Sequence, residues 1–384
     1  MKLTIKAGAL LNAIDQAGMT IGKKADLPFS WMYLEARGDK ENQRLLAFAT
    51  DMVGRTLVKT PATVSKPGSV FIKHGLLAGF LGTVPKEDDI ELSLTGEKLS
   101  FKCAAGRGNL YLRNTADDTS KAIDSLPYKG KPIFEIKSSI LQELISRTEF
   151  ATTTDRQPIL SAVNISAVKG GFVADATDGH IVARAVINDD ESPAEKQTIT
   201  IPSIGLIPLV KLLATHKEES VKIIPGLEEA VLSHNMYFRF SDVIYGTTLL
   251  ADTYPNIDYL FDTAHKVAGP EFIVGMDALK KALSRAEPFS EGGHVILNFE
   301  DNTLKIKAEG PTRGKFETSL EGAKPEQKIK VEVSVDMAYI IRAIKDGHST
   351  NLRIITSTDN SRIWMKDDED EKQTATYLLG CVRQ

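Results

Sequence analysis

One pattern occurs three times along this chain. Each copy opens with an apolar strand that runs directly into an amphipathic helix, at Leu3–Ile5, Phe134–Ile136 and Phe272–Val274. A second pair of strand and helix follows in each copy, beginning at Val70–Ile72, at Ile201 and at Val333. Corresponding positions are roughly 130 residues apart, so the chain is predicted to be one folding unit copied in tandem. Function should then depend on what three copies build together.

Between the two helices of each copy, apolar and polar residues alternate in short runs rich in β-branched residues. This period of two predicts half-buried antiparallel strands. Each copy should hold about eight strands and two helices, with the helices on one face of the sheet, which is an α+β fold. Polar, proline-punctuated segments at Ala116–Lys131 and Asp262–Pro270 read as linkers. We therefore expect three domains, at residues 1–126, 127–266 and 267–384.

The composition excludes several classes of protein. The chain of 384 residues is 42% hydrophobic and 26% charged, which is typical of a soluble globular protein. Its two cysteines, Cys103 and Cys381, fall in different copies, which fits a reducing cytoplasm and offers no disulfide framework. No apolar run approaches the roughly 20 residues of a membrane span. The net charge of −4 argues against tight wrapping of DNA, although a local basic surface remains possible.

The sequence offers little that is typical of an enzyme. No histidine pair has the spacing of a helical zinc site, and no Walker loop or nucleophile elbow is present, so no metal or cofactor is expected. Asp178 and His180 suggest a hydrolase pair, but the corresponding segment of the first copy keeps only Asp51. An acidic residue kept at one turn of two copies is more typical of a side chain that caps the turn. We expect a non-enzymatic protein and keep a hydrolase as a weak alternative.

Sheet edges suggest what three copies could form. Each unit should leave unpaired backbone groups at both lateral edges, and such edges must be paired or covered. Three units side by side can pair edge to edge, and two chains arranged head to tail would then close a ring with no free edge. The predicted helices would line its hole. They carry a slight excess of basic residues, the right sign for a polyanion, although solvated helix faces account for most of these charges.

Particular motifs also resemble a known family. The stretch Phe150–Val163, the segment Ala176–His180, the tripeptide Thr253–Pro255 and the terminal strand Tyr377–Arg383 are similar to bacterial DNA sliding clamps, the beta subunit of the replicative polymerase. The resemblance covers the whole chain. It implies a cytoplasmic, nucleoid-associated homodimeric ring around duplex DNA. Such a ring raises processivity, needs no cofactor, and tethers DNA polymerase, the clamp loader and repair proteins through short linear motifs.

The resemblance also implies roles for individual residues. Partner peptides would enter an apolar pocket between the second and third domains, formed by Leu160, Thr177, Gly179, His180, Val182, Pro255, Leu260, Leu378, Gly380, Val382 and Arg383. The residues facing DNA would be Lys23, Lys24, Lys73, Arg147, Lys211 and Arg285. The dimer interface would bring Phe80 and Leu110 of one chain against Phe289 of the other.

Two departures from the family pattern fall in the expected pocket. Ile181 stands where the family usually has an arginine, and Gly380-Cys381-Val382 replaces Met-Pro-Met. A wider and less rigid pocket is expected. The alternative to a clamp is a protein-interaction scaffold of the same fold that does not close on DNA.

Overall fold

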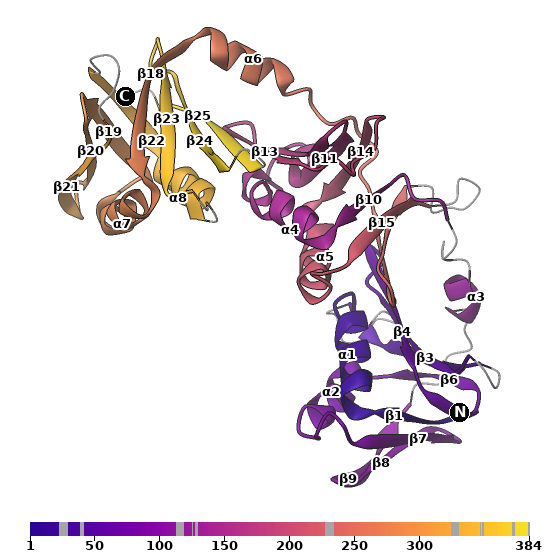
Figure 1. Ribbon diagram of the computed structural model, residues 1–384. Coiled ribbons are helices and arrows are strands. Elements are labelled where there is room, and N and C mark those ends of the chain that lie inside the picture. The colour runs from indigo at the N-terminus through magenta and orange to yellow at the C-terminus, as the bar shows by residue number, and fades with distance from the viewer. Residues whose placement is uncertain are drawn as a thin grey trace. The chain divides into compact units, whose positions relative to one another are not determined.

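The computed structural model describes residues 1–22, 30–38, 42–112, 119–124, 126, 130–226, 234–323, 330–345, 347, 349–370 and 373–382. The chain forms two compact units (Figure 1). The first unit combines Met1–Ser139 with Ile204–Leu249, and the second combines Ile140–Ser203 with Leu250–Gln384. The middle sequence repeat is therefore divided between the two units.

The first unit contains two antiparallel sheets. The smaller has the order β5-β1-β7-β8-β9 and the larger the order β10-β15-β16-β17-β4-β3-β2-β6. The smaller sheet comprises β1 (Lys2–Lys6), β5 (Thr63–Lys66), β7 (Asp89–Thr95), β8 (Lys98–Cys103) and β9 (Gly106–Tyr111). The larger comprises β2 (Met32–Arg37), β3 (Arg44–Thr50), β4 (Gly54–Pro61), β6 (Gly68–Ile72), β10 (Phe134–Lys137), β15 (Ser220–Pro225), β16 (Asn235–Arg239) and β17 (Val243–Thr248).

The second unit also has two antiparallel sheets. Their orders are β14-β11-β12-β13-β25-β24-β23-β18 and β21-β20-β19-β22. The larger comprises β11 (Ala162–Val168), β12 (Gly171–Thr177), β13 (Ile181–Asn188), β14 (Gln197–Pro202), β18 (Ala268–Gly275), β23 (Asn351–Ser357), β24 (Arg362–Asp370) and β25 (Gln373–Gly380). The smaller comprises β19 (His294–Glu300), β20 (Thr303–Gly310), β21 (Gly314–Glu321) and β22 (Lys330–Asp336).

In the described residues, each repeat carries the two helices that the sequence predicts. They are α1 (Ala7–Gly18), α2 (His74–Leu81), α4 (Ser138–Ser146), α5 (Ser203–Thr215), α7 (Met276–Ala286) and α8 (Met337–Lys345), with 3-10 turns η2 (Glu149–Ala151), η3 (Pro158–Ser161) and η4 (Glu287–Phe289). Helix α7 buries Met276, Leu279 and Leu283, a spacing that places apolar side chains on one face. Within the part of the chain that is described, no helix is long and apolar enough to cross a membrane.

The repeats join edge to edge, which confirms the expected pairing. Strand β4 of the first repeat pairs with β17 of the second, for example Val58 with Val243. Strand β13 of the second repeat pairs with β25 of the third, for example Val182 with Leu378. The middle repeat thus gives β10 and β15–β17 to one sheet and β11–β14 to another. Each continuous sheet satisfies edge groups that a single repeat would leave open.

Both linkers contain helices that the sequence did not predict. Helix α3 (Thr119–Asp124) lies in the first linker, and α6 (Asp258–Lys266) begins before the second and extends into it. In the first unit, Leu57 and Ile244 pack with Ile123 of α3. Their strand neighbour Tyr245 faces the other way and donates a hydrogen bond to the carbonyl of Gly205 in α5. Because side chains alternate along a strand, α3 and α5 cover opposite faces of this sheet.

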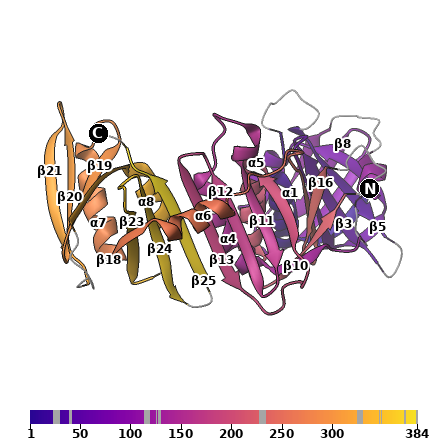
Figure 2. The same cartoon turned by 90° about the horizontal axis from the view of Figure 1, so that it is seen from above.

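Helix α6 covers the corresponding junction in the second unit. It crosses the strands β13, β25 and β24 in Figure 2, and its Leu260 and Phe261 pack against the buried cluster of Val182, Trp364 and Leu378. The linker helices therefore pack over the strand pairs that join one repeat to the next.

Candidate partner-binding site

The turn between β12 and β13 is built by its own side chains. Asp178 Oδ1 accepts hydrogen bonds from the backbone N–H groups of His180 (2.8 Å) and Ile181 (2.9 Å). Thr177 Oγ1 accepts from the N–H of Gly179 at 3.1 Å and donates to the carbonyl of Ile181 at 2.7 Å. Gly179 has φ +90°, a conformation that favours glycine. The prediction that Asp178 caps a turn is confirmed.

The first repeat contains the same device. Asp51 Oδ1 accepts from the N–H groups of Val53 (3.1 Å) and Gly54 (2.7 Å), and Met52 takes the left-handed conformation with φ 80°. The hydroxyl of Thr50 donates to the carbonyl of Gly54, as Thr177 does in the second repeat. Two copies of one turn, only one of which carries a histidine, are best explained by folding rather than by catalysis.

A bond from the third repeat fixes the turn further. The hydroxyl of Tyr339 in α8 donates to Asp178 Oδ2. Burial first, and then this bond to a carboxylate, raise the pKa of Tyr339 above its ordinary range. The imidazole of His180 instead contacts the guanidinium of Arg156. Asp178 therefore does not orient the His180 ring, and the hydrolase alternative loses the geometry it requires.

Behind the turn lies the apolar cluster of Val182, Ile257, Trp364 and Leu378, each no more than 6% exposed. Leu260 packs against this cluster from α6. The structure thus brings together three of the residues that the resemblance implied for the pocket, namely Val182, Leu260 and Leu378. At the turn, the N–H of Gly380 donates to the carbonyl of His180 at 3.2 Å, so the end of β25 also belongs to the site.

Three other expected pocket residues differ from these in exposure. Leu160 is half-buried in the turn η3, Pro255 is exposed, and Val382 is 37% exposed. Arg383 lies outside the described residues. Pro255 and Val382 expose side-chain surface that a partner could contact, whereas Val182 and Leu378 expose little surface.

Sequence reasoning missed two residues of this site. Trp364 lies in a predicted strand, and the strand register pairs it with Leu378. The alternation of apolar residues along β24 could therefore have indicated that Trp364 faces the same cluster. Arg156 lies within the stretch that carries the family resemblance. Its guanidinium packs against Gly179 so closely that a Cβ added to this glycine would lie 2.9 Å from Arg156 Nη1. An exposed cation therefore stands at the rim of the turn, beside the exposed His180.

The expected DNA-facing residues differ in their surroundings. Lys211 and Arg285 are exposed on α5 and α7. Lys73 is half-buried, with its ammonium 3.3 Å from Ser30 Oγ and 4.7 Å from the centre of the Trp31 ring. Lys23 and Lys24 lie outside the described residues.

Arg147 contradicts the expectation that it is exposed. Its side chain is 4% exposed and forms ion pairs with Glu143 and Asp367. The nitrogen Nη1 lies 3.2 Å from Asp367 Oδ2, and that carboxylate is equally buried. A guanidinium held between two carboxylates inside the protein cannot reach a DNA phosphate, so Arg147 is removed from the DNA-facing set.

The expected interface residues lie beside other aromatic rings. Phe80 is half-buried with its ring centre 4.5 Å from that of Phe101, and Phe289 is half-buried and stacked at 5.5 Å on Phe316. Leu110 is only 8% exposed within its own chain. Their role at a dimer interface stays a prediction.

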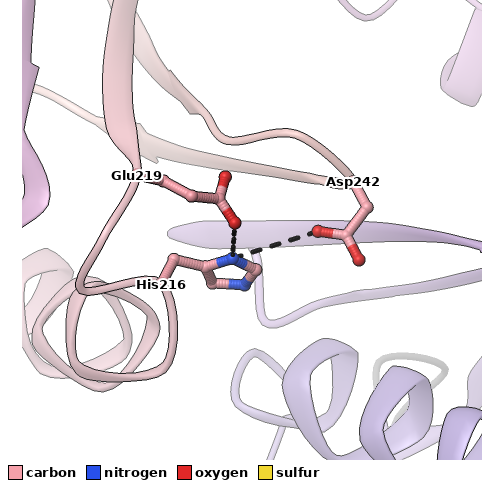
Figure 3. A group of neighbouring side chains, drawn as sticks. All are labelled: His216, Glu219 and Asp242. Atoms are coloured by element: carbon pink, nitrogen blue, oxygen red, sulfur yellow. Dashed lines mark hydrogen bonds and ion pairs between the residues drawn. The ribbon is translucent and has the colours of Figure 1, made fainter.

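One group of histidine and carboxylates stands out among the described residues (Figure 3). His216 Nδ1 lies 2.7 Å from Glu219 Oε1 and 4.0 Å from Asp242 Oδ1. Its Nε2 lies 3.1 Å from Gln16 Oε1, and Gln16 Nε2 donates to Asn12. The contacts of the His216 ring with Glu219 and with Gln16 therefore connect the end of α5 to α1.

Comparison with known proteins agrees with this arrangement. The family model for the central domain of the DNA polymerase III beta subunit matches residues 135–256 of this chain. The model for the C-terminal domain of that subunit matches residues 266–380. The beta sliding clamp of Pseudomonas aeruginosa is 22% identical over 393 residues, which cover 100% of both chains. A crystal structure of the DNA polymerase III subunit beta from P. aeruginosa has a TM-score of 0.86 at 19% identity, with 100% of both chains covered. A sliding clamp from P. aeruginosa bound to griselimycin has a TM-score of 0.84 at 20% identity, also with full coverage of both chains.

Three α+β repeats that share sheets across their edges define the clamp class of protein. The chain belongs to the bacterial beta sliding clamp family, the beta subunit of DNA polymerase III. Members of this family are non-catalytic accessory subunits that act as replication processivity factors.

Proposed function

We propose that two copies of this chain assemble head to tail into a ring that encloses duplex DNA. We further propose that the ring tethers the replicative polymerase and other DNA-processing enzymes, including the clamp loader and repair proteins. These partners bind through short peptides at the site between the second and third repeats. Enclosure keeps the protein on DNA without tight contacts to phosphate, which suits a chain with a net charge of −4.

The observation that carries the proposal is the repeated pairing of strands between repeats. Strand β4 pairs with β17, and β13 pairs with β25. The equivalent strand of the third repeat is β21, and the equivalent partner in the first repeat is β9. Both are edge strands of the described sheets. Pairing β21 of one copy with β9 of the next repeats the same junction and closes the ring after two chains.

The side chains near these edges suit an interface. Leu110 lies on β9, and Phe80 contacts Phe101 on the neighbouring strand β8. Phe289 stacks on Phe316 of β21. Apolar and aromatic side chains at both edges supply the surface that an obligate interface needs, in addition to backbone hydrogen bonds.

The helices supply the surface that would face DNA. Lys211 and Arg285 lie on the exposed sides of α5 and α7, opposite the leucines that these helices bury. A few mobile cations allow weak phosphate contacts that can be exchanged during sliding. Lys73 belongs to the same proposed set, with a more restricted side chain.

Mass in solution and retention on DNA test the ring. Sedimentation should give twice the chain mass of 42.0 kDa, and the protein should remain on circular DNA and leave after the circle is cut. Phe289→Ala should lower both the dimer fraction and the retention. Phe71→Ala, which removes a comparable half-buried ring whose centre lies 5.1 Å from that of Tyr33, should change neither. A monomer at micromolar concentration, or equal retention on linear DNA, would favour the scaffold alternative.

Peptide capture needs a separate test, because the ring could exist without it. Griselimycin is bound to the sliding clamp in a P. aeruginosa structure, and we propose it as a probe that occupies this site. Calorimetric titration should give one site per chain, and Val382→Asp should weaken binding because it places a charge on the exposed apolar rim. Unchanged affinity in Val382→Asp would place the ligand elsewhere.

A further inference from the structure

One arginine of the sheet binds helix α6. Arg184 of β13 forms a two-point ion pair with Asp175 of β12, at 2.7 and 3.0 Å, and its Nη2 lies 2.6 Å from Asp258 Oδ1. Asp258 is the first residue of α6. The same guanidinium lies 4.5 Å from the centre of the Phe261 ring, one turn further along the helix. Arg184 therefore holds α6 through both a carboxylate and an aromatic ring.

This attachment suits a short helix that needs tertiary support. With nine residues, α6 is below the length at which isolated helices are stable in water. An acidic residue in its first turn interacts favourably with the helix dipole, and the planar guanidinium can bind two carboxylates in fixed directions. Asp175 is 7% exposed, so its pair with Arg184 is protected from solvent and forms a rigid base.

The attachment lies beside the apolar cluster of the candidate site. Leu260 follows Asp258 by two residues and packs against the cluster that contains Val182 and Leu378. The position of Leu260 thus depends on where α6 is held. We propose that Arg184 is a positioning residue that fixes α6 as a preformed wall of the peptide site, an inference that rests on the proposed peptide-binding function.

The first unit contains a matching device at its own junction, where no peptide site is proposed. Arg37 of β2 lies 2.6 Å from Glu35 Oε1, binds Asp124 of α3, and donates to Ser120 Oγ at 2.8 Å. At both junctions an arginine from the sheet binds an aspartate of the helix that covers the junction. Arg37 therefore provides a control in which the same kind of bond is lost at the other junction.

The test compares Arg184→Met with Arg37→Met by hydrogen exchange and by griselimycin titration. Arg184→Met should raise amide exchange in residues 258–266 by about tenfold and weaken griselimycin by about tenfold, mainly through faster dissociation. Arg37→Met should raise exchange in residues 119–124 and leave the griselimycin Kd within about twofold. Asp258→Asn retains the buried Asp175–Arg184 pair, so it keeps the test valid if Arg184→Met does not fold.

Each outcome decides the proposal. Faster exchange in α6 with an unchanged Kd would show that α6 is no part of the wall, and unchanged exchange in both Arg184→Met and Asp258→Asn would show that Arg184 does not hold the helix. Failure of the unaltered protein to bind griselimycin would count against the peptide site itself. In that case the exchange measurement still decides whether Arg184 fixes α6.

Discussion

Replacing Arg147 with methionine should destabilise the second compact unit more than any surface substitution. The guanidinium is 4% exposed and lies 3.2 Å from the equally buried carboxylate of Asp367. Methionine fills most of the volume but leaves a buried carboxylate without its cation, which costs about 3–5 kcal/mol. Glu143, with 22% of its side chain exposed, can turn toward solvent and should add little. For a unit of about 200 residues this corresponds to a fall in Tm on the order of 10 °C.

Differential scanning calorimetry and a double-mutant cycle measure this cost. Arg147→Met combined with Asp367→Asn should be more stable than Arg147→Met alone, because the second change removes the buried charge. Arg353→Met is the exposed control, since Arg353 and its partner Glu271 are 45% and 38% exposed. Its cost should be less than about 1 kcal/mol.

DNA retention separates this structural role from the DNA-facing role that the family resemblance implied. At a temperature where both proteins are folded, Arg147→Met should leave the salt dependence of retention unchanged, whereas Lys211→Met should reduce it. A Tm within about 2 °C of the unaltered protein would refute the reasoning. So would a reduced salt dependence in Arg147→Met with normal stability.

Three further substitutions test other parts of the structure. Burial raises the pKa of Glu219, but hydrogen bonds from His216 and a backbone N–H outweigh this effect and lower that pKa below its usual 4.5. Urea unfolding should therefore show Glu219→Gln to be less stable above pH 4.5, and the difference should shrink as the pH falls below 4.5 through the lowered pKa. Burial and then neighbouring arginines lower the pKa of Lys59 to about 8. Lys59→Met should therefore raise the free energy of unfolding by about 1 kcal/mol at pH 7, after allowance for partial solvent screening. This gain should disappear as the pH rises from 8 to 10.5. Tyr339→Phe removes the hydrogen bond to Asp178, and calorimetry should show a loss of about 1 kcal/mol together with a weaker griselimycin titration.

Local sequence patterns determined the elements of this fold and their threefold repetition. The period of two in strands and the 3.6-residue period of helices depend on neighbouring residues alone, so the strand at Phe272–Val274 and the buried face of α7 could be predicted. The turn at Asp178 could also be predicted from the sequence, because its hydrogen bonds reach only two and three residues ahead. The edge-to-edge junctions followed from the general need to pair open strands.

Tertiary structure alone decided which charged and apolar side chains meet. Arg147 and Asp367 are 220 residues apart in the chain, and nothing near either residue indicates that they pair inside the protein. The same holds for Trp364 beneath α6 and for Arg184, whose partners Asp175 and Asp258 come from another strand and from a helix that the sequence did not predict. A short amphipathic segment gains its helical form and its buried face only from the sheet it packs on. The threefold repeat could therefore be predicted from the sequence. Which side chains pack together at each junction between repeats could be learned only from the folded chain.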